Sequence, residues 1–355
     1  MSLSFTLDQF ILTDSLFASL FILVISTLAL GALACRPLGL GEALALGVLL
    51  SLALLLREGA GILSVLFLLL LGCRIFLSPQ GQRLKSCIGA VSVFVPLFLT
   101  SQIYQGWNEN RTGDRFITTG GQTVYLQGLV DAARRDTLIF SGDTDMDLAA
   151  RDILADYSFA EVLQILSRLY DEGYQAPALA AMSRGKYMQA WVERPSSMLR
   201  MTVGHMRESL AFMTFQPLAA IRDTGFWATG ERPWPDYSGL KRNLSDGTGT
   251  IILFGFESLE RVTGILLTLS FLLTPAVWLV RAFRRRDWNT LLSGPVLVPV
   301  ALWLFYLGFM IAHAMVHLET RYMAPVLPFS IMIGLLGIQG IYIAVRQRIR
   351  GRNAS

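Results

Sequence analysis

The chain carries little charge for its size. Of its 355 residues, 16% are charged and 53% are hydrophobic, whereas an ordinary soluble domain has about 25% charged residues. This composition excludes a soluble enzyme with a single core. It also excludes a disordered chain, which combines low hydrophobicity with high charge. A low share of charged residues with a high share of hydrophobic ones is typical of a polytopic membrane protein.

Cysteine and histidine are also scarce. The three cysteines, Cys35, Cys73 and Cys87, lie in or beside apolar segments, which fits neither a disulfide framework nor a metal cluster. Two of the three histidines, His313 and His317, stand at helical spacing but lack the glutamate of a zinc-protease motif. We therefore expect no metal and no cofactor. Glycine-rich phosphate loops and nucleic-acid-binding patches are missing too, so nucleic acid is not an expected partner.

Long apolar runs are what the sequence has in quantity. Seven of them can each cross a bilayer, which takes about 20 residues of helix. They cover residues 14–34, 40–56, 60–77, 87–105, 261–283, 291–313 and 323–345. The sequence therefore predicts an all-α polytopic membrane protein with about seven transmembrane helices.

A long polar segment interrupts these runs. The predicted parts are transmembrane helices 1–4 at 1–105, an insert at 106–260, transmembrane helices 5–7 at 261–345 and a basic tail at 346–355. Apolar residues at three- and four-residue spacing predict helices in the insert over 147–170, 175–191 and 196–221. The β-branched and glycine-rich stretch 115–130 predicts an extended segment or a loop.

The charges predict the orientation of the chain. Residues 105–259 contain 19 acidic and 15 basic side chains, and the rest contains 7 acidic and 15 basic ones. Seven successive spans would place the loops on alternating sides of the membrane. Twelve of the 15 basic residues outside 105–259 then fall on one side, and only Arg57, Arg261 and Arg321 fall on the other. Basic residues favour the cytoplasmic side. We therefore expect an inner (plasma) membrane protein with a cytoplasmic C-terminus and an extracytoplasmic N-terminus and insert.

The most specific polar cluster lies at the predicted outer end of the sixth span. It contains His317, Glu319, Arg321 and Tyr322. Ionisable residues at membrane depth are costly and usually functional. Arg321 has the geometry to hold a phosphate or to pair with Glu319. The alternative is an arginine and a tyrosine that only anchor the helix at the interface.

Two further groups belong to the same predicted outer face. Arg57 and Glu58 join the second and third spans, where an arginine opposes the positive-inside bias. Anion binding explains such a position, and so does an ion pair at a tight turn. Asp8 and Asp14 lie near the start of the first span, where carboxylates also stabilise a helix N-terminus. Arginines and carboxylates at a membrane boundary suit a lipid-phosphate substrate whose tail stays in the bilayer.

These residues resemble a known family. The run HLETRYMAPVLP at 317–328 resembles a signature of bacterial GT-C glycosyltransferases, the polyprenyl-phosphate-sugar-dependent enzymes related to protein mannosyltransferases and aminoarabinose transferases. Three more runs are similar to segments of that family and follow in its order. They are TDSLFASLFILVISTLAL at 13–30, LALLLREGAGILSVLFLLLL at 52–71 and YMQAWVERPSSMLRMTVGHMRES at 187–209. Together the four runs are spread over most of the chain, from residue 13 to residue 328.

The resemblance implies an inverting transfer of a hexose or pentose. The donor would be a polyprenyl-phosphate-linked sugar among the membrane lipids, and the acceptor a glycan, a lipid or a protein. Arg57 and Arg321 would bind the donor phosphate, and His317 and Tyr322 would support them. The catalytic carboxylate stays unassigned among Asp8, Asp14, Glu58 and Glu319.

The chain departs from the family in one respect. The family's catalytic aspartate lies in a first outer loop, and this sequence starts at what resembles the middle of the family's membrane domain. We therefore expect either the C-terminal part of such an enzyme or a chain that works with a separate N-terminal subunit. Two alternatives remain: a non-catalytic subunit or degenerate relative, and a transporter or polymerase of lipid-linked sugars.

Overall fold

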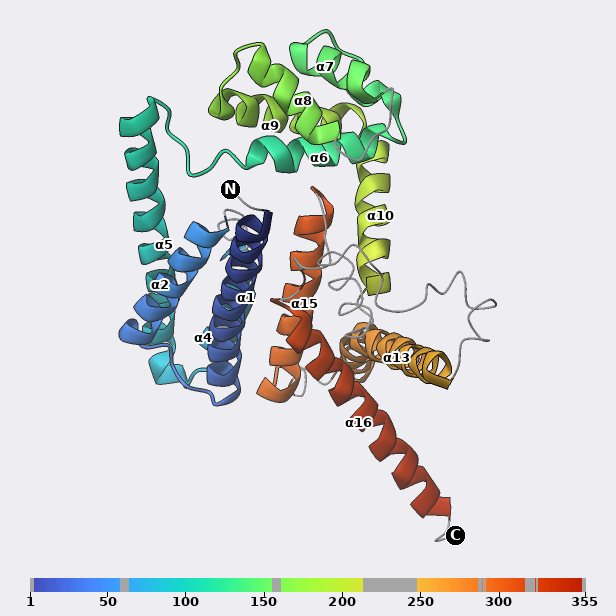
Figure 1. Ribbon diagram of the computed structural model, residues 1–355. Coiled ribbons are helices and arrows are strands. Elements are labelled where there is room, and N and C mark those ends of the chain that lie inside the picture. The colour runs from blue at the N-terminus through green and yellow to red at the C-terminus, as the bar shows by residue number, and fades with distance from the viewer. Residues whose placement is uncertain are drawn as a thin grey trace. The chain divides into compact units, whose positions relative to one another are not determined.

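The computed structural model describes the backbone of residues 3–57, 64–154, 161–212, 248–286, 289, 292–316, 323 and 325–352 (Figure 1). For some helical residues, 3–15 among them, only the backbone is described. Within these ranges the chain forms twelve α-helices and no strand, which confirms the all-α prediction. It divides into two compact units, Met1–Arg207 with Asn289–Val326, and Glu208–Trp288 with Leu327–Ser355.

Apolar helices form one part of the first unit. They are α1 (Leu3–Leu33), α2 (Leu40–Leu56), α4 (Phe67–Leu77), α5 (Arg83–Thr112) and α15 (Gly294–Ala314), with short 3₁₀ turns at Ser64–Leu66 and Gln80–Gln82. Helix α2 packs along α5, and α1 packs against α2, α4 and α15.

Glycines bring α2 and α5 close together. A Cβ at Gly47 would meet the Val93 carbonyl oxygen and would lie 2.8 Å from Pro96 Cδ. At the other end of the contact, a Cβ at Gly89 would lie 3.0 Å from Leu38 Cγ. Small residues at such contacts let two helix backbones approach, which is how helices associate in lipid.

A buried arginine ties α1, α2 and α4 together at one end of this bundle. The Arg74 side chain has no exposed surface. Its Nε donates to the Arg36 carbonyl oxygen at 2.6 Å, and its Nη2 lies 3.0 Å from Glu42 Oε2. The guanidinium also packs against the backbone of Gly31, where a Cβ would overlap it. The predicted span 60–77 contains Arg74, and the charge count assigns it to the cytoplasmic side; the structure adds that its side chain is enclosed by polar partners.

The insert folds as a compact helical cluster in the same unit. Its elements are α6 (Gly121–Ala133), the 3₁₀ helix η3 (Thr137–Phe140), α7 (Asp145–Leu154), α8 (Glu161–Asp171), α9 (Ala176–Glu193) and α10 (Pro195–Phe212). The helices predicted at 175–191 and 196–221 correspond to α9 and α10. The one predicted at 147–170 corresponds to two described helices, α7 and α8, and residues 155–160 lie outside the described ranges.

The expectation of an extended segment or loop over 115–130 is wrong for its second half. Helix α6 begins at Gly121, and Leu126, Leu129 and Val130 are buried in the core of the insert. These residues stand at i, i+3 and i+4, which places them on one face of a helix. Burial of that face outweighs the weak helix propensity of the glycines and β-branched residues.

A buried ion pair joins α7 to α9. The Thr144 hydroxyl donates to Asp147 Oδ2 at 2.6 Å, and the Asp147 N–H donates back to Thr144 Oγ1 at 3.2 Å. Lys186 Nζ approaches the other carboxylate oxygen at 2.7 Å. Asp147 therefore lies in the first turn of α7, where it engages Thr144 and also pairs with Lys186 of α9.

The second unit contains two long helices, α13 (Thr248–Arg285) and α16 (Leu327–Arg352), packed against each other. The Ser270 hydroxyl of α13 donates to the Gly334 carbonyl oxygen of α16 at 2.7 Å. A Cβ at Gly334 would lie 2.9 Å from the Leu267 carbonyl oxygen. Small residues and a hydroxyl hydrogen bond are typical contacts between membrane helices.

Four of the seven expected spans are long and apolar enough to cross a membrane within the described residues. They are Leu16–Leu33, Gln80–Thr112, Val262–Arg284 and Gly294–Ala314. The other three expected spans coincide with shorter apolar helical segments, Leu40–Leu56, Ser64–Leu77 and Leu327–Ile343. The chain therefore has the helices of a multi-pass membrane protein.

Candidate functional site

Arg57 ends α2 and lies against α1. Its N–H donates to the Ala53 carbonyl oxygen at 2.9 Å, which closes the last turn of the helix. Its guanidinium carbon is 5.6 Å from the centre of the Phe17 ring, within the range of a cation–π contact. Phe17 follows Asp14 by three residues in α1, which is less than one helical turn. The fold thus brings Arg57 close to the part of α1 that carries Asp14.

A row of aromatic rings connects the contact between Arg57 and Phe17 to the end of α15. The Phe17 and Phe21 ring centres are 4.5 Å apart, and Phe21 meets Phe309 of α15 at 6.2 Å. Phe309 in turn contacts the His313 ring at 4.5 Å. The end of α2, the middle of α1 and the last turns of α15 therefore lie at the same end of the bundle.

The helical insert holds the last turn of α15. The Tyr187 hydroxyl of α9 donates to the Met315 carbonyl oxygen at 2.6 Å, and His205 Nδ1 of α10 lies 2.9 Å from the Ala314 carbonyl oxygen. A Cβ at Gly128 of α6 would lie 2.7 Å from the Val316 carbonyl oxygen. The last carbonyls of a helix have no partner within it. Here α10 and α9 contact the carbonyls of Ala314 and Met315, and α6, which lies above the end of α15 in Figure 1, approaches the backbone at Val316.

Electrostatics support this contact. Burial raises the pKa of the Tyr187 phenol, so the group stays protonated and donates its hydrogen bond. On the other side of the imidazole, His205 Nε2 lies 3.3 Å from Asp131 Oδ2 of α6. His205 is therefore held between a carboxylate of the insert and a carbonyl of α15. The chain leaves α15 at this fixed point and continues toward His317.

The predicted site residues fall into two groups. Arg57 is described with its side chain, and Asp8 and Asp14 are described as backbone within α1. The others lie outside the described residues: Glu58, His317, Glu319, Arg321 and Tyr322. The structure thus brings Arg57, α1 and the end of α15 to one end of the bundle.

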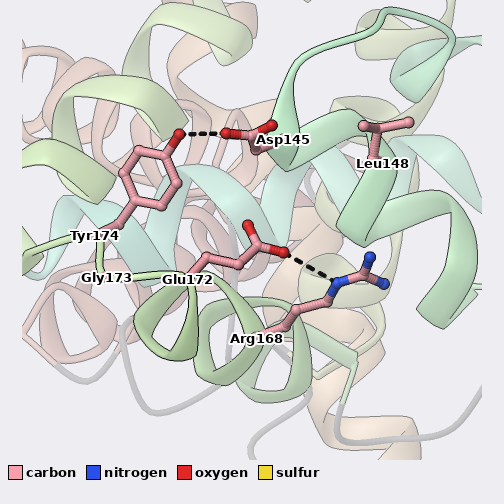
Figure 2. Close-up of a pocket in the computed structure, with 6 residues that line it drawn as sticks. All are labelled: Asp145, Leu148, Arg168, Glu172, Gly173 and Tyr174. Carbon is pink, nitrogen blue, oxygen red and sulfur yellow. Dashed lines mark hydrogen bonds and ion pairs between the residues drawn. The ribbon is translucent and has the colours of Figure 1, made fainter.

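A pocket of about 390 Å³ lies elsewhere on the insert, between α7 and α8 (Figure 2). The residues that line it are Asp145, Leu148, Arg168, Glu172, Gly173 and Tyr174.

The polar groups of the pocket engage one another. The Tyr174 phenol donates to the Asp145 carboxylate, which raises the pKa of Tyr174. Arg168 Nε lies 3.3 Å from Glu172 Oε1, and Arg168 Nη1 lies 2.7 Å from Asp152 Oδ2. These hydrogen bonds raise the pKa of Arg168, so its charge persists at every ordinary pH. Carboxylates outnumber the guanidinium here, which disfavours a phosphate ligand.

The insert residues that hold α15 were not predicted from the sequence. Tyr187 and His205 lie in the run 187–209 that is similar to the GT-C family, but nothing in that run indicates their contact with α15, since their partners lie more than 100 residues away in the sequence. Gly128 lies outside the four runs.

No protein-family model matches the chain, and searches among curated proteins and solved structures found no match. Among the described residues there is also no group of three or more side chains of the metal-binding types that could hold a metal ion. The site is therefore argued from its own geometry and from the motifs in the sequence.

Proposed function

We propose that the chain transfers a sugar from a polyprenyl-phosphate donor to an acceptor at the extracytoplasmic face of the plasma membrane. The observation that carries the proposal is the placement of Arg57. This arginine lies at the same end of the bundle as the end of α15, which leads to Arg321, and the polar insert covers that end. A lipid-linked phosphate requires this combination of cations, membrane helices and a polar cover.

The proposal assigns seven spans to the membrane, with the insert outside. Helix α5 supports this placement, because about 30 Å of helix separates Lys85 from Tyr104, the thickness of a hydrocarbon core. Near Tyr104, where α5 would leave the hydrocarbon core, Tyr104 and Trp107 form the ring pair expected at a membrane interface. Arg111 lies 4.6 Å from the Trp107 ring centre.

The membrane boundary near Lys85, at the start of α5, is the cytoplasmic one in this proposal. Arg36, Arg83 and Lys85 lie at or beside helix ends on that side, as the positive-inside rule requires. The apolar span Leu16–Leu33 of α1 begins at this Arg57 contact, and α2 and α15 end near it, so the proposal places the insert and Arg57 on the opposite, extracytoplasmic side.

The chemistry follows from the charges. An acceptor hydroxyl attacks the anomeric carbon of the donor, the bond from that carbon to the phosphate oxygen breaks, and the configuration inverts. A carboxylate accepts the hydroxyl proton; its candidates are Asp8, Asp14, Glu58 and Glu319. Arg57 and Arg321 stabilise the negative charge that develops on the leaving phosphate, with His317 and Tyr322 beside them.

Substitution of the two arginines tests the proposal in the full chain. The chain is reconstituted in liposomes with a polyprenyl-phosphate sugar labelled in the sugar, and labelled acceptor is measured. We expect Arg57→Ala and Arg321→Ala each to abolish transfer while membrane insertion stays normal. Arg36→Ala is the matched control, because Arg36 is 63% exposed at the opposite end of the bundle.

Three outcomes would contradict parts of the proposal. Normal transfer by both arginine variants would remove their proposed roles. Wild-type chain that binds the donor but transfers nothing would favour a non-catalytic subunit or degenerate relative. Movement of the labelled donor across the bilayer without transfer would favour a transporter of lipid-linked sugars.

A further inference from the structure

One face of α10 is exposed although it combines apolar and cationic side chains. Leu199 and Val203 are 56% and 55% exposed, and Arg200 and Arg207 are exposed beside them. These four residues stand at i, i+1, i+4 and i+8, so they share one side of the helix. We call them the outer face of α10. On the opposite side, Met198 and Met201 are buried in the core of the insert.

Helix α10 runs from the insert to the end of an apolar helix long enough to span a membrane. Near its start, the Ser197 hydroxyl donates to Asp136 Oδ2 at 2.6 Å, within the insert. Two turns later, His205 meets the Ala314 carbonyl oxygen at the end of α15. The outer face therefore extends from the insert down to the level at which α15 ends (Figure 1).

The Arg200 side chain points toward the start of α10. Arg200 Nε donates to the Ser196 carbonyl oxygen at 3.2 Å, so the guanidinium turns back toward the start of the helix and away from the end of α15. Arg135, in the turn after α6, contacts the same helix, since its Nη1 donates to the Arg200 carbonyl oxygen at 3.3 Å. Long cationic side chains at a membrane boundary take this arrangement, with the stem over apolar surface and the charge in the headgroup layer.

Two described carboxylates lie near this side of α10. Asp136 accepts a hydrogen bond from Ser197 and is also under the electrostatic influence of Arg200, and Asp131 lies against His205. Arg135, Arg200 and Arg207 outnumber these two carboxylates, so the described side chains here carry an excess of positive charge. Cations at a membrane surface are attracted to anionic lipid headgroups.

We propose that the outer face of α10 is a lipid-contact surface. Leu199 and Val203 enter the boundary between headgroups and acyl chains, and Arg200 and Arg207 bind the phosphate groups of bilayer phospholipids. The inference rests on the membrane placement of α15 and is independent of glycosyl transfer. Its consequence is that the insert is held to the bilayer by a second contact besides the end of α15.

Spin-label accessibility in the full chain tests this contact. The exposed cysteines Cys35 and Cys87 are changed to serine, and Cys73 is left because it is buried. A label at Val203→Cys is compared with one at Leu163→Cys on α8, where Leu163 is 66% exposed. In lipid nanodiscs, we expect a several-fold higher ratio of oxygen to nickel-chelate accessibility at position 203 than at 163, because oxygen partitions into the bilayer.

Equal, water-like ratios at the two positions would overturn the proposal. So would an immobile label at 203 that is shielded from both reagents, since that result indicates a protein partner. Charge reversal tests the arginines separately: Arg200→Glu with Arg207→Glu should lower the ratio at 203 in discs that contain phosphatidylglycerol. If that double variant changes nothing, the arginines do not bind lipid phosphate. Measurement at 163 in every background shows whether the insert keeps its fold.

Discussion

The two ends of the helix bundle in the first unit each have an arginine, and the two arginines lie in opposite environments. Arg74 has no exposed surface, and its donors face Glu42 and the carbonyls of Arg36 and Thr27. Arg57 is half-buried at a helix end, where its contact with Phe17 is through the face of a ring. The first side chain is enclosed and serves the packing of three helices. The second side chain is only partly buried, and the proposed function gives it a binding role.

The difference teaches that an arginine beside a span can have either of two purposes. At the Arg74 end, charge is paired inside the protein, and a buried cation without partners would be very costly. At the Arg57 end, the insert supplies its polar groups to the end of α15 through Tyr187 and His205. The stability of the first unit should therefore depend most on the Arg74 end, and binding of the lipid-linked phosphate on the Arg57 end.

Removal of the Arg74 side chain should have the largest effect on stability. We expect Arg74→Met to destabilise the first unit by about 3–5 kcal/mol, because it leaves Glu42 without its closest cation and breaks an enclosed ion pair. Thermal unfolding in detergent measures the loss. Arg36→Ala is the control, since its 3.5 Å pair with Glu42 is exposed and contributes at most about 1 kcal/mol. Equal losses for the two variants would contradict the comparison.

At the other end, Tyr187→Phe should cost less. The variant removes the hydroxyl that donates to the part-buried Met315 carbonyl oxygen, and the loss of such a hydrogen bond costs about 1 kcal/mol. Tyr170→Phe is a matched control, because the exposed Tyr170 hydroxyl bonds only to the Gln122 side chain among the hydrogen bonds described. Hydrogen exchange should rise at the end of α15 in the first variant alone. Unchanged exchange there would mean that the insert does not hold this helix end.

The apolar framework at both ends could be predicted from the sequence. Helix α2 coincides with the predicted span 40–56, and α15 lies within one to three residues of the predicted 291–313. The sequence can predict these helices because the length of an apolar run can be read from neighbouring residues alone. It does not depend on which other helix the run packs against. The prediction fails for α6, because only the core of the insert explains why Gly121–Ala133 is helical.

The polar contacts could not be predicted, because their partners are distant in sequence. Arg74 pairs with a glutamate 32 residues away, and Tyr187 bonds to a carbonyl 128 residues away. Arg57 was identified because its position conflicts with the charge rule for loops. Arg74 agrees with that rule, so nothing in the sequence distinguished it from the loop charges. The residues at 317–322 stay a prediction from their motif, as they lie outside the described residues.

Ser197→Ala should have a moderate and pH-dependent effect on the insert. The Ser197 hydroxyl lowers the pKa of Asp136, so this hydrogen bond stabilises the fold above the ordinary carboxyl pKa of about 4. That stability is lost as the pH falls through the lowered folded-state pKa. We expect Ser197→Ala to cost about 1 kcal/mol at pH 7 and less at pH 3. Chemical unfolding at both pH values measures this, with the exposed Ser196→Ala as control. A cost that is constant with pH would exclude the carboxylate as its source.

Arg57→Ala should have the smallest effect on stability. The contact between its guanidinium and the Phe17 ring contributes about 0.5–1 kcal/mol at a partly exposed site, far less than the loss expected at Arg74. Binding should show the opposite order: Arg57→Ala should abolish retention of a polyprenyl-phosphate probe, and Arg57→Lys should retain part of it because the charge remains. Unfolding and probe binding, measured on the same preparations, separate the two effects. If Arg57→Ala unfolds the protein as Arg74→Met does, then Arg57 is a second structural arginine and the proposed difference between the two ends is wrong.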